Sequence, residues 1–259
     1  MGNEDLILQT RNLGRDFRGF TAVNGVDLRV ARGSIHALIG PNGAGKTTCF
    51  NLLTRFLPAT RGSIVFNEDD ITRAAPQDVA RRGLIRSFQI SSVFAQMSVL
   101  QNVRIALQRP TGLSFQFWRS DRILQRLDER ARELLDQVGL GADAERRTVE
   151  LPYGRKRALE FATTLAADPK LMLLDEPTQG MGHEDVGRIT ELIRRVAAGR
   201  TVLMVEHNMS VIAGLCDRIT VLARGSVLAE GSYGEVSANA AVREAYMGGS
   251  ESQLQGIGH

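Results

Sequence analysis

A glycine-rich segment that follows the apolar run at 35–39 carries the groups most able to do chemistry in this chain. It consists of Gly40, Pro41, Asn42, Gly43, Ala44, Gly45, Lys46, Thr47 and Thr48. Its glycines permit backbone angles and close approaches that a Cβ would forbid, so successive amide N–H groups can point at phosphate oxygens. A helix expected to open around Lys46 adds the positive end of its dipole. Lys46 can reach the β- and γ-phosphates, Thr48 can make a secondary phosphate contact, and the Thr47 hydroxyl can ligate Mg²⁺. The pattern predicts binding of ATP or GTP.

Two adjacent carboxylates, Asp175 and Glu176, follow the apolar run at 171–174. Alternation along a strand is expected to send their side chains in different directions, so one can face a metal and the other a water molecule. We expect Asp175 to hold Mg²⁺ through its water shell. Glu176 would then polarise the water that attacks in line with the γ-phosphate.

Gln89 and His207 also follow predicted strands, at 84–88 and 201–206. The Gln89 amide can contact Mg²⁺ or the attacking water. The strand before His207 is expected to run parallel to the strand before Glu176, so both open onto the same sheet edge, where the imidazole can bind the γ-phosphate and orient Glu176. Taken alone, a glutamine is usually a solvated loop residue and a histidine a helix cap. The phosphate loop in the same chain favours the catalytic interpretation.

These residues need a sheet that brings distant strand ends together. Apolar runs predict early strands at 6–10, 23–30, 35–39 and 63–67. Later strands at 171–174 and 201–205 alternate with helices expected from 152 to about 167 and from 184 to 198. Such alternation predicts a parallel sheet. A pair of strands around a turn at 224–225 follows, within residues 218–230.

Residues 100–139 change to helical spacing with dense charge, which predicts a helical insertion. Within it, residues 109–120 break the period with Pro, Gly and Ser and carry Phe115, Phe117 and Trp118, so a loop with an aromatic tip is expected. The Gly-, Ser- and Gln-rich stretch from 248 is expected to be a disordered tail.

Composition restricts the class of protein. The 259 residues are 43% hydrophobic, enough for a core, and carry a formal net charge of only +3, which does not decide the partner. Cys49 and Cys216 lie far apart without metal-like spacing, so reduced thiols are expected. No apolar run approaches the roughly 20 residues of a membrane span, and no export signal is seen. We expect a soluble, unexported chain.

Five features of the chain resemble, in their order and separation, those of the nucleotide-binding subunit of ABC transporters. They are the phosphate loop, Gln89, the stretch LPYGR at 151–155, the Asp175–Glu176 pair and His207. The resemblance covers nearly the whole chain. Within that family, the segments RSFQ, LPYGRKRALE, DEPTQGM, VEHNMSVI and VREAYMGG are similar to those of the ATPases of branched-chain amino acid importers.

This resemblance implies an α/β P-loop NTPase fold, that of an ABC ATPase, with a parallel core sheet, an N-terminal antiparallel β subdomain and an inserted helical subdomain. Residues 1–259 would form a single ABC ATPase domain. Its parts would be a nucleotide-binding core with the β subdomain at 1–89 and 165–247, a helical insertion at 90–164 and a tail at 248–259.

The resemblance also implies that two cassettes close face to face around ATP and Mg²⁺, with Thr47, Gln89 and Asp175 serving the metal. Each phosphate loop would face the partner's signature segment, formed here by Pro152, Tyr153, Gly154 and Arg155. Backbone N–H groups at the start of the helix after Pro152 would meet the partner's γ-phosphate. This segment lacks the serine common in the family, and Gly182 stands where many cassettes have Asp.

For the adenine, the resemblance implies stacking on Phe17, expected in the loop before Val23, with Val23 beneath the sugar and base. Phe20 is the competing residue, and either phenylalanine could instead be part of the core.

The function implied is an ATP-hydrolysing subunit that energises import of branched-chain or related hydrophobic amino acids. Expected partners are a second ABC ATPase subunit, two membrane permease subunits and, indirectly, an external substrate-binding protein. The resemblance favours a related distinct chain as the second ATPase subunit, and a second copy of this chain is the alternative. The chain would be peripheral on the cytoplasmic face of the inner membrane. Residues 90–102, with Phe94 and Met97, would receive a permease helix; alternatively, these two side chains belong to the core of the insertion.

Two other functions remain open at this stage. The same cassette could serve urea or amide import or lipopolysaccharide export. A soluble ABC ATPase acting on nucleic acid or the ribosome is disfavoured by the weak charge excess, the single cassette and the lack of a coiled-coil arm. We therefore expect no nucleic-acid partner.

Overall fold

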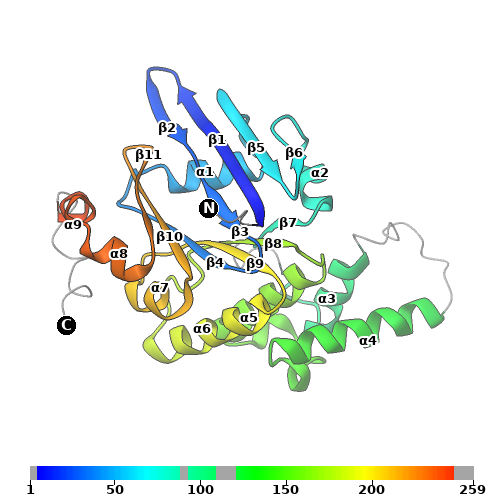
Figure 1. Ribbon diagram of the computed structural model, residues 1–259. Coiled ribbons are helices and arrows are strands. Elements are labelled where there is room, and N and C mark those ends of the chain that lie inside the picture. The colour runs from blue at the N-terminus through cyan, green and yellow to red at the C-terminus, as the bar shows by residue number, and fades with distance from the viewer. Residues whose placement is uncertain (1–4, 88–92, 109–120, 248–259) are drawn as a thin grey trace.

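The computed structural model describes residues 5–87, 93–108 and 121–247. Gln89, the expected loop at 109–120 and the expected tail at 248–259 lie outside the described residues. Two sheets form the framework (Figure 1). Among the described residues, no helix is both long and apolar enough to cross a membrane.

The central sheet has six strands in the order β11-β10-β4-β9-β8-β7. Their bounds are Ser226–Gly231, Arg218–Ala223, Ile35–Ile39, Thr201–Val205, Leu171–Asp175 and Leu84–Arg86. Four of the five ladders are parallel, and only β11 pairs antiparallel to its neighbour. The strand that leads into the phosphate loop, β4, therefore lies between β9 and β10, both from the end of the chain.

A second, antiparallel sheet lies across the first (Figure 1). It consists of β2 (Phe20–Val26), β1 (Leu6–Phe17), β5 (Arg61–Phe66) and β6 (Asp69–Asp70), with β3 (Arg29–Ala31) also paired to β1. Helix α1 (Lys46–Leu53) runs beneath this sheet and buries Cys49, Phe50, Leu52 and Leu53.

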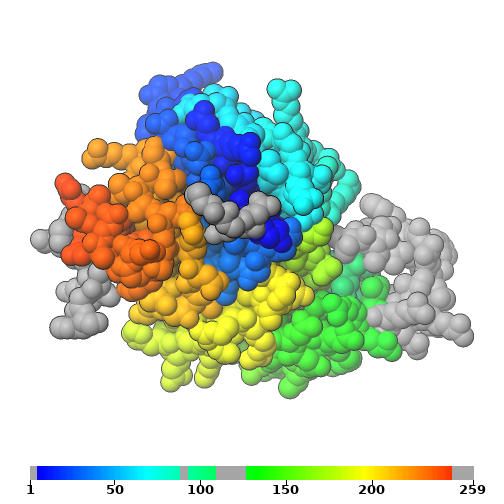
Figure 2. Space-filling view, in the orientation of Figure 1, coloured from blue at the N-terminus to red at the C-terminus, as the bar shows by residue number. Residues whose placement is uncertain are grey.

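The remaining helices cover the flanks of the two sheets. They are α2 (Pro76–Arg81), α3 (Val99–Gln108), α4 (Asp121–Gln137), α5 (Tyr153–Leu165), α6 (His183–Ala197), α7 (Met209–Leu215), α8 (Tyr233–Ala238) and α9 (Ala240–Met247), with short 3-10 turns at Gly141–Asp143 and Thr148–Glu150. Helices α3 and α4 extend to one side of the molecule, whereas α8 and α9 lie on the opposite flank (Figures 1 and 2).

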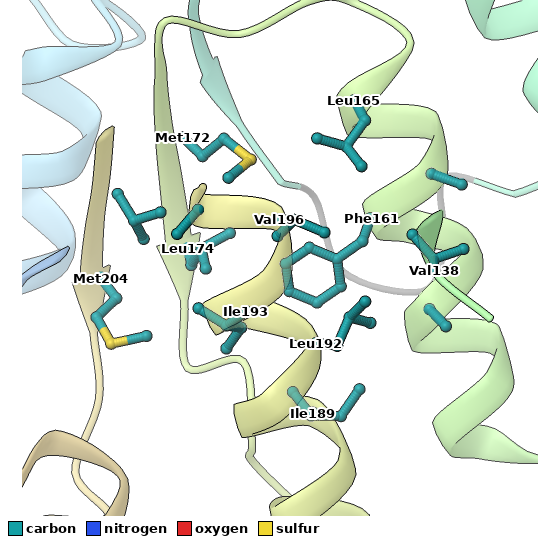
Figure 3. Packing of buried hydrophobic residues seen from close by; sticks show 14 of the residues in the cluster. Val138, Phe161, Leu165, Met172, Leu174, Ile189, Leu192, Ile193, Val196 and Met204 are labelled. Atoms are coloured by element: carbon teal, nitrogen blue, oxygen red, sulfur yellow. The ribbon is translucent and has the colours of Figure 1, made fainter. Parts of the chain in front are cut away.

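Alternation along the central strands divides the buried side chains between two clusters. On β8, Met172 and Leu174 face a cluster with α5 and α6, whereas Leu171 and Leu173 face the cluster around α1. Figure 3 shows the first cluster, where the ring of Phe161 from α5 lies against side chains of α6. Because both faces are covered, these strands have continuous apolar runs rather than an alternating pattern.

The structure confirms the predicted parallel sheet, including the strands at 35–39 and 201–205. The single strand expected at 23–30 is instead two, since β2 and β3 pair with different parts of β1. The strand expected at 6–10 continues to Phe17, so Phe17 ends β1 rather than lying in a loop. Alternation and propensity could not reveal this length, because β1 gains pairing partners on both of its edges.

Candidate functional site

The phosphate loop connects β4 to α1 and depends on glycine at both ends. Gly40 has φ +150°, and a Cβ placed there would lie 2.1 Å from the carbonyl oxygen of Leu222. Gly45, the N-cap of α1, has φ +99°, and its Cβ would lie 2.5 Å from the carbonyl oxygen of Ala22. A larger residue at either position would displace the backbone, so glycine is needed for the loop to pass this close to the carbonyl groups of Leu222 and Ala22.

Lys46 folds back over this loop. Its Nζ donates to the carbonyl oxygens of Gly40, at 2.6 Å, and Pro41, at 3.0 Å. Burial lowers the pKa of the Lys46 ammonium, while the charges of Glu176 and Asp175 act in the opposite direction. The carboxylates thus lie close enough for their charges to act on the lysine, which gathers these sequence-predicted residues into one site.

The strand end at Asp175 pairs in parallel register with Val205, one residue before Glu206. Glu176 then leaves the strand with φ +46°, and its backbone N–H donates to the carbonyl oxygen of Val205 at 2.9 Å. Glu176 therefore lies just beyond the regular strand, which ends at Asp175, so the turn of the chain sets the direction of its side chain. A left-handed backbone at a residue with a side chain is strained and must be held by its surroundings.

His207 follows β9 at the same edge, as expected, and its side chain is 55% exposed. Beside it, Glu206 has a fully buried carboxylate that the sequence analysis did not single out. This carboxylate accepts hydrogen bonds from the backbone N–H groups of His207 and Asn208, and from the backbone N–H and hydroxyl of Thr178. Glu206 thus links the loop after Glu176 to the loop that carries His207. The available signal was an acid directly after the apolar run at 202–205.

Replacing Glu206 by Gln should misplace both loops, because an NH₂ group would face donors that now bind a carboxylate. We expect the free energy of unfolding to fall by about 2 kcal/mol and kcat for ATP hydrolysis to fall by about tenfold or more, with KM for ATP nearly unchanged. Steady-state kinetics and thermal unfolding would measure these effects. Glu191→Gln, at an exposed ion pair with Arg194, is the control, and an unchanged kcat in Glu206→Gln would contradict this role.

Arg86, at the end of β7, is a second residue that the sequence analysis missed. Its Nη2 forms an ion pair with Oδ2 of Asp175, and its Nη1 donates to Oδ1 of Asn51 in α1 at 2.7 Å. Its guanidinium also lies 5.9 Å from the ring centroid of Phe50. One cation therefore joins the carboxylate at the end of β8 to the helix that begins in the phosphate loop.

The signature segment opens α5 at some remove from these residues in the chain. Pro152 is the N-cap, and no side chain caps the first turn. Tyr153 is 48% exposed, and its hydroxyl donates to the carbonyl oxygen of Gln179 at 3.4 Å. Gly154 lies close to Asp185, and the Arg155 guanidinium pairs with Asp143. Arg155 is thus engaged within its own chain, while the start of α5 remains accessible.

The two candidate phenylalanines for adenine lie at adjacent strand ends, paired as Phe17 and Phe20 across β1 and β2. Both are exposed, Phe20 more so at 64% against 41%, and the Arg15 guanidinium lies 4.8 Å from the Phe17 ring centroid. Val23 is fully buried, and its Cγ2 lies near Gly45 under the phosphate loop. Val23 therefore packs against the phosphate loop at Gly45.

The C-terminal helix also reaches the phosphate loop. Tyr246 in α9 is buried, and its hydroxyl is hydrogen-bonded to the backbone of Gly40. Burial raises the pKa of Tyr246 to about 12, so the hydroxyl stays neutral. The same side chain lines a small cavity with Ile39, Tyr233 and Val242. Nothing in the sequence pattern had connected residue 246 with the loop at residue 40.

These residues fit ATP together with Mg²⁺. Within the part of the chain that the structure describes, no three His, Cys, Asp or Glu side chains are grouped to hold a metal ion. Mg²⁺ carried by phosphates needs only one or two protein oxygens, and the exposed Thr47 hydroxyl and the Asp175 carboxylate supply hard oxygen donors of that kind. Gln89, the third expected ligand, lies outside the described residues.

Comparison with known proteins gives two matching family models. The model described as "ABC transporter" matches residues 23–179. The model described as "Branched-chain amino acid ATP-binding cassette transporter" matches residues 226–252, which include α8 and α9.

Curated relatives match over almost their full length. The high-affinity branched-chain amino acid transport ATP-binding protein LivG of Salmonella typhimurium is 36% identical over 249 residues, covering 93% of this chain and 98% of the relative. The protein BraF of Pseudomonas aeruginosa, described in the same words, is 34% identical over 252 residues with the same coverage.

Solved structures agree with the fold. A nucleotide-free ATP-binding cassette from an ABC transporter superposes with a TM-score of 0.81 at 29% identity, covering 93% of this chain and 98% of that one. The ADP conformation of an ATP-binding cassette also gives 0.81, at 28% identity, covering 94% and 99%. The phosphate loop, the parallel sheet and these matches lead to one conclusion: the chain belongs to the ABC transporter family and is an ATP-hydrolysing subunit of a transporter.

Proposed function

We propose that this ATPase energises the import of branched-chain or related hydrophobic amino acids. The observation that supports this cargo is the family model matched by residues 226–252, whose description names branched-chain amino acids, together with relatives described in the same terms. The matched segment includes Tyr246, the side chain that reaches the phosphate loop.

At the site, Lys46 and the N–H groups of residues 40–48 bind the phosphates, and Thr47 and Asp175 hold Mg²⁺ together with Gln89. Bound Mg²⁺ would neutralise charge on the β- and γ-phosphates. Glu176 accepts a proton from the attacking water, and its exposed neighbour His207 contacts the γ-phosphate. The left-handed turn at Glu176 supports this assignment, because strained backbone is concentrated at functional sites.

The chain acts with a second cassette, a related distinct chain rather than a second copy. The accessible, uncapped start of α5 supports a role for Pro152, Tyr153, Gly154 and Arg155 at the partner's nucleotide, since a helix N-terminus binds anions. Gly182, the N-cap of α6, offers no carboxylate to join the two sites.

Two permeases hold the assembly at the membrane, with an external binding protein acting through them. The chain is peripheral at the cytoplasmic face. Its single ABC ATPase domain consists of a core at 1–89 and 165–247 and a helical insertion at 90–164, and the described helices of the insertion pack against the core. Phe94 and Met97 are 53% and 38% exposed, and the buried Asn102 fixes the segment by accepting from the backbone N–H of Phe94 at 2.7 Å. This fixed apolar surface is the permease contact.

The double substitution Phe94→Asp and Met97→Asp should reduce transport by about tenfold or more, because exposed apolar anchors dominate contact energies. ATP binding by the detached subunit should be unchanged. Transport assays in reconstituted vesicles would measure this, with Phe56→Asp as the control, since Phe56 is 54% exposed and lies after α1. Normal transport by the double variant would refute the docking assignment.

Affinity purification tests the proposed function as a whole. A tagged Glu176→Gln protein would be recovered with Mg-ATP from detergent-solubilised native membranes, and its partners identified by mass spectrometry. Multispanning permeases, a second cassette and a neighbouring amino acid binding protein would support the proposal. Recovery with lipopolysaccharide-export components, with urea or amide permeases, or with ribosomes alone would contradict it.

A further inference from the structure

Arg86 and Asp175 form a partly buried ion pair in the middle of the nucleotide site. Their side chains are 15% and 23% exposed, which is less than either partner in most of the ion pairs that the described residues form on the surface. The pair joins neighbouring parallel strands, β7 and β8, in the ladder where Arg86 pairs with Leu173. The Coulombic attraction within a pair so poorly solvated is stronger than within an exposed pair, and removing one partner leaves the other as an uncompensated charge.

A third group fixes the position of the arginine. Asn51 accepts from Nη1 of Arg86 at 2.7 Å, while Nη2 of the same guanidinium contacts Asp175. Both partners present oxygen atoms, so the planar guanidinium is held at two points. Arg86 is therefore a fixed positive charge at the carboxylate to which the proposed function assigns Mg²⁺.

We propose that Arg86 is the internal counter-ion of Asp175, which holds this carboxylate in place before the nucleotide arrives and weakens the site's affinity for Mg²⁺. The proposal rests on the proposed function for the assignment of Mg²⁺ to Asp175. Oxygen-ligated Mg²⁺ is attracted by the full negative charge of a carboxylate. A guanidinium already paired with that carboxylate offsets part of the attraction. The metal can therefore enter and leave the site together with its nucleotide.

Two effects of opposite sign follow for Arg86→Gln. In the nucleotide-free protein with EDTA, Asp175 loses its counter-ion, so the melting temperature should fall. With nucleotide, the metal should bind more tightly, because one nearby positive charge has been removed; the expected gain is about tenfold. A residue that merely supported the strand would give a loss in both measurements.

The experiment measures the affinity of the full chain for a fluorescent ATP analogue in EDTA and in excess Mg²⁺. The dissociation constant in EDTA divided by that in excess Mg²⁺ reports how strongly the metal favours nucleotide binding. This ratio should rise by about tenfold in Arg86→Gln and stay close to the parent value in Arg86→Lys, which keeps the charge. Arg82→Gln is the matched control, because Arg82 pairs with Asp69 on the surface, with side chains 43% and 58% exposed.

An unchanged or lower ratio in Arg86→Gln would overturn the proposal. If Arg86→Gln does not fold, the same comparison is made with Arg86→Lys, which retains the positive charge but loses the second of the two fixed contacts. A ratio within about twofold of the parent value supports the role of Arg86 as counter-ion. A large fall in the ratio overturns that role. A parent protein with no difference between EDTA and Mg²⁺ would instead remove the metal assignment itself. That result is distinct from a failure at Arg86.

Discussion

Glu176→Gln should bind ATP and hydrolyse it at least about 100-fold more slowly than the parent. The substitution keeps the size of the side chain and removes only the basic oxygen, while the backbone turn at φ +46° and the N–H bond to Val205 are independent of the side chain. ATP should therefore persist between two cassettes, and the closed dimer should accumulate. Phosphate release and size-exclusion chromatography with Mg-ATP would measure the two effects.

Glu184→Gln provides the matched control for this experiment. Glu184 lies in the first turn of α6, eight positions further along the chain, with a side chain that is 90% exposed. Its substitution should leave turnover unchanged. Near-normal turnover by Glu176→Gln would show that Glu176 is not the general base. Asp175 could take that role only if it gave up its ion pair with Arg86.

Lys46→Ala should weaken the binding of ATP itself by about tenfold to a hundredfold, the effect of losing a charged hydrogen bond to phosphate. The Lys46 ammonium is already partly desolvated and held over the loop by two carbonyl oxygens, so turning to a phosphate costs it only part of its hydration. Direct binding of a fluorescent ATP analogue would measure the change.

Lys170→Ala is the control for the lysine experiment, because Lys170 is exposed and precedes β8 at the end opposite the site. It should bind ATP as the parent does. Retained affinity in Lys46→Ala would contradict the assignment of residues 40–48 to phosphate binding, whereas a loss of affinity without any change in melting temperature would support it.

The parts of the fold that repeat a local pattern were predictable. The apolar runs at 35–39 and 171–174 and the glycines at 40, 43 and 45 carry their own signals, because a strand covered on both faces is a nearly continuous apolar run. The run at 35–39 is interrupted only by His36, which is buried and hydrogen-bonded to Thr220. The break between β2 and β3 had no such signal. It arises because β1 pairs with both strands and also with β5, and pairing between distant segments leaves no trace in composition.

The candidate site was predictable where a residue acts through its own chemistry, as with Lys46 and Asp175. It was not predictable where a residue acts through a contact from another part of the chain. Glu206 meets Thr178, and Tyr246 meets Gly40, across separations that no sequence period can express. Arg86 was hidden for the same reason, since its partners come from α1 and β8.

The position of β4 has a consequence for how the protein is made on the ribosome. The strand that leads into the phosphate loop is paired on both edges by β9 and β10, so residues 35–39 find their neighbours only when residues 201–205 and 218–223 have been synthesised. At about 5–20 residues per second, the nascent chain waits about ten seconds or more with these apolar edges unpaired. Nascent chains that stop before residue 218 should therefore depend on chaperones and should bind no ATP.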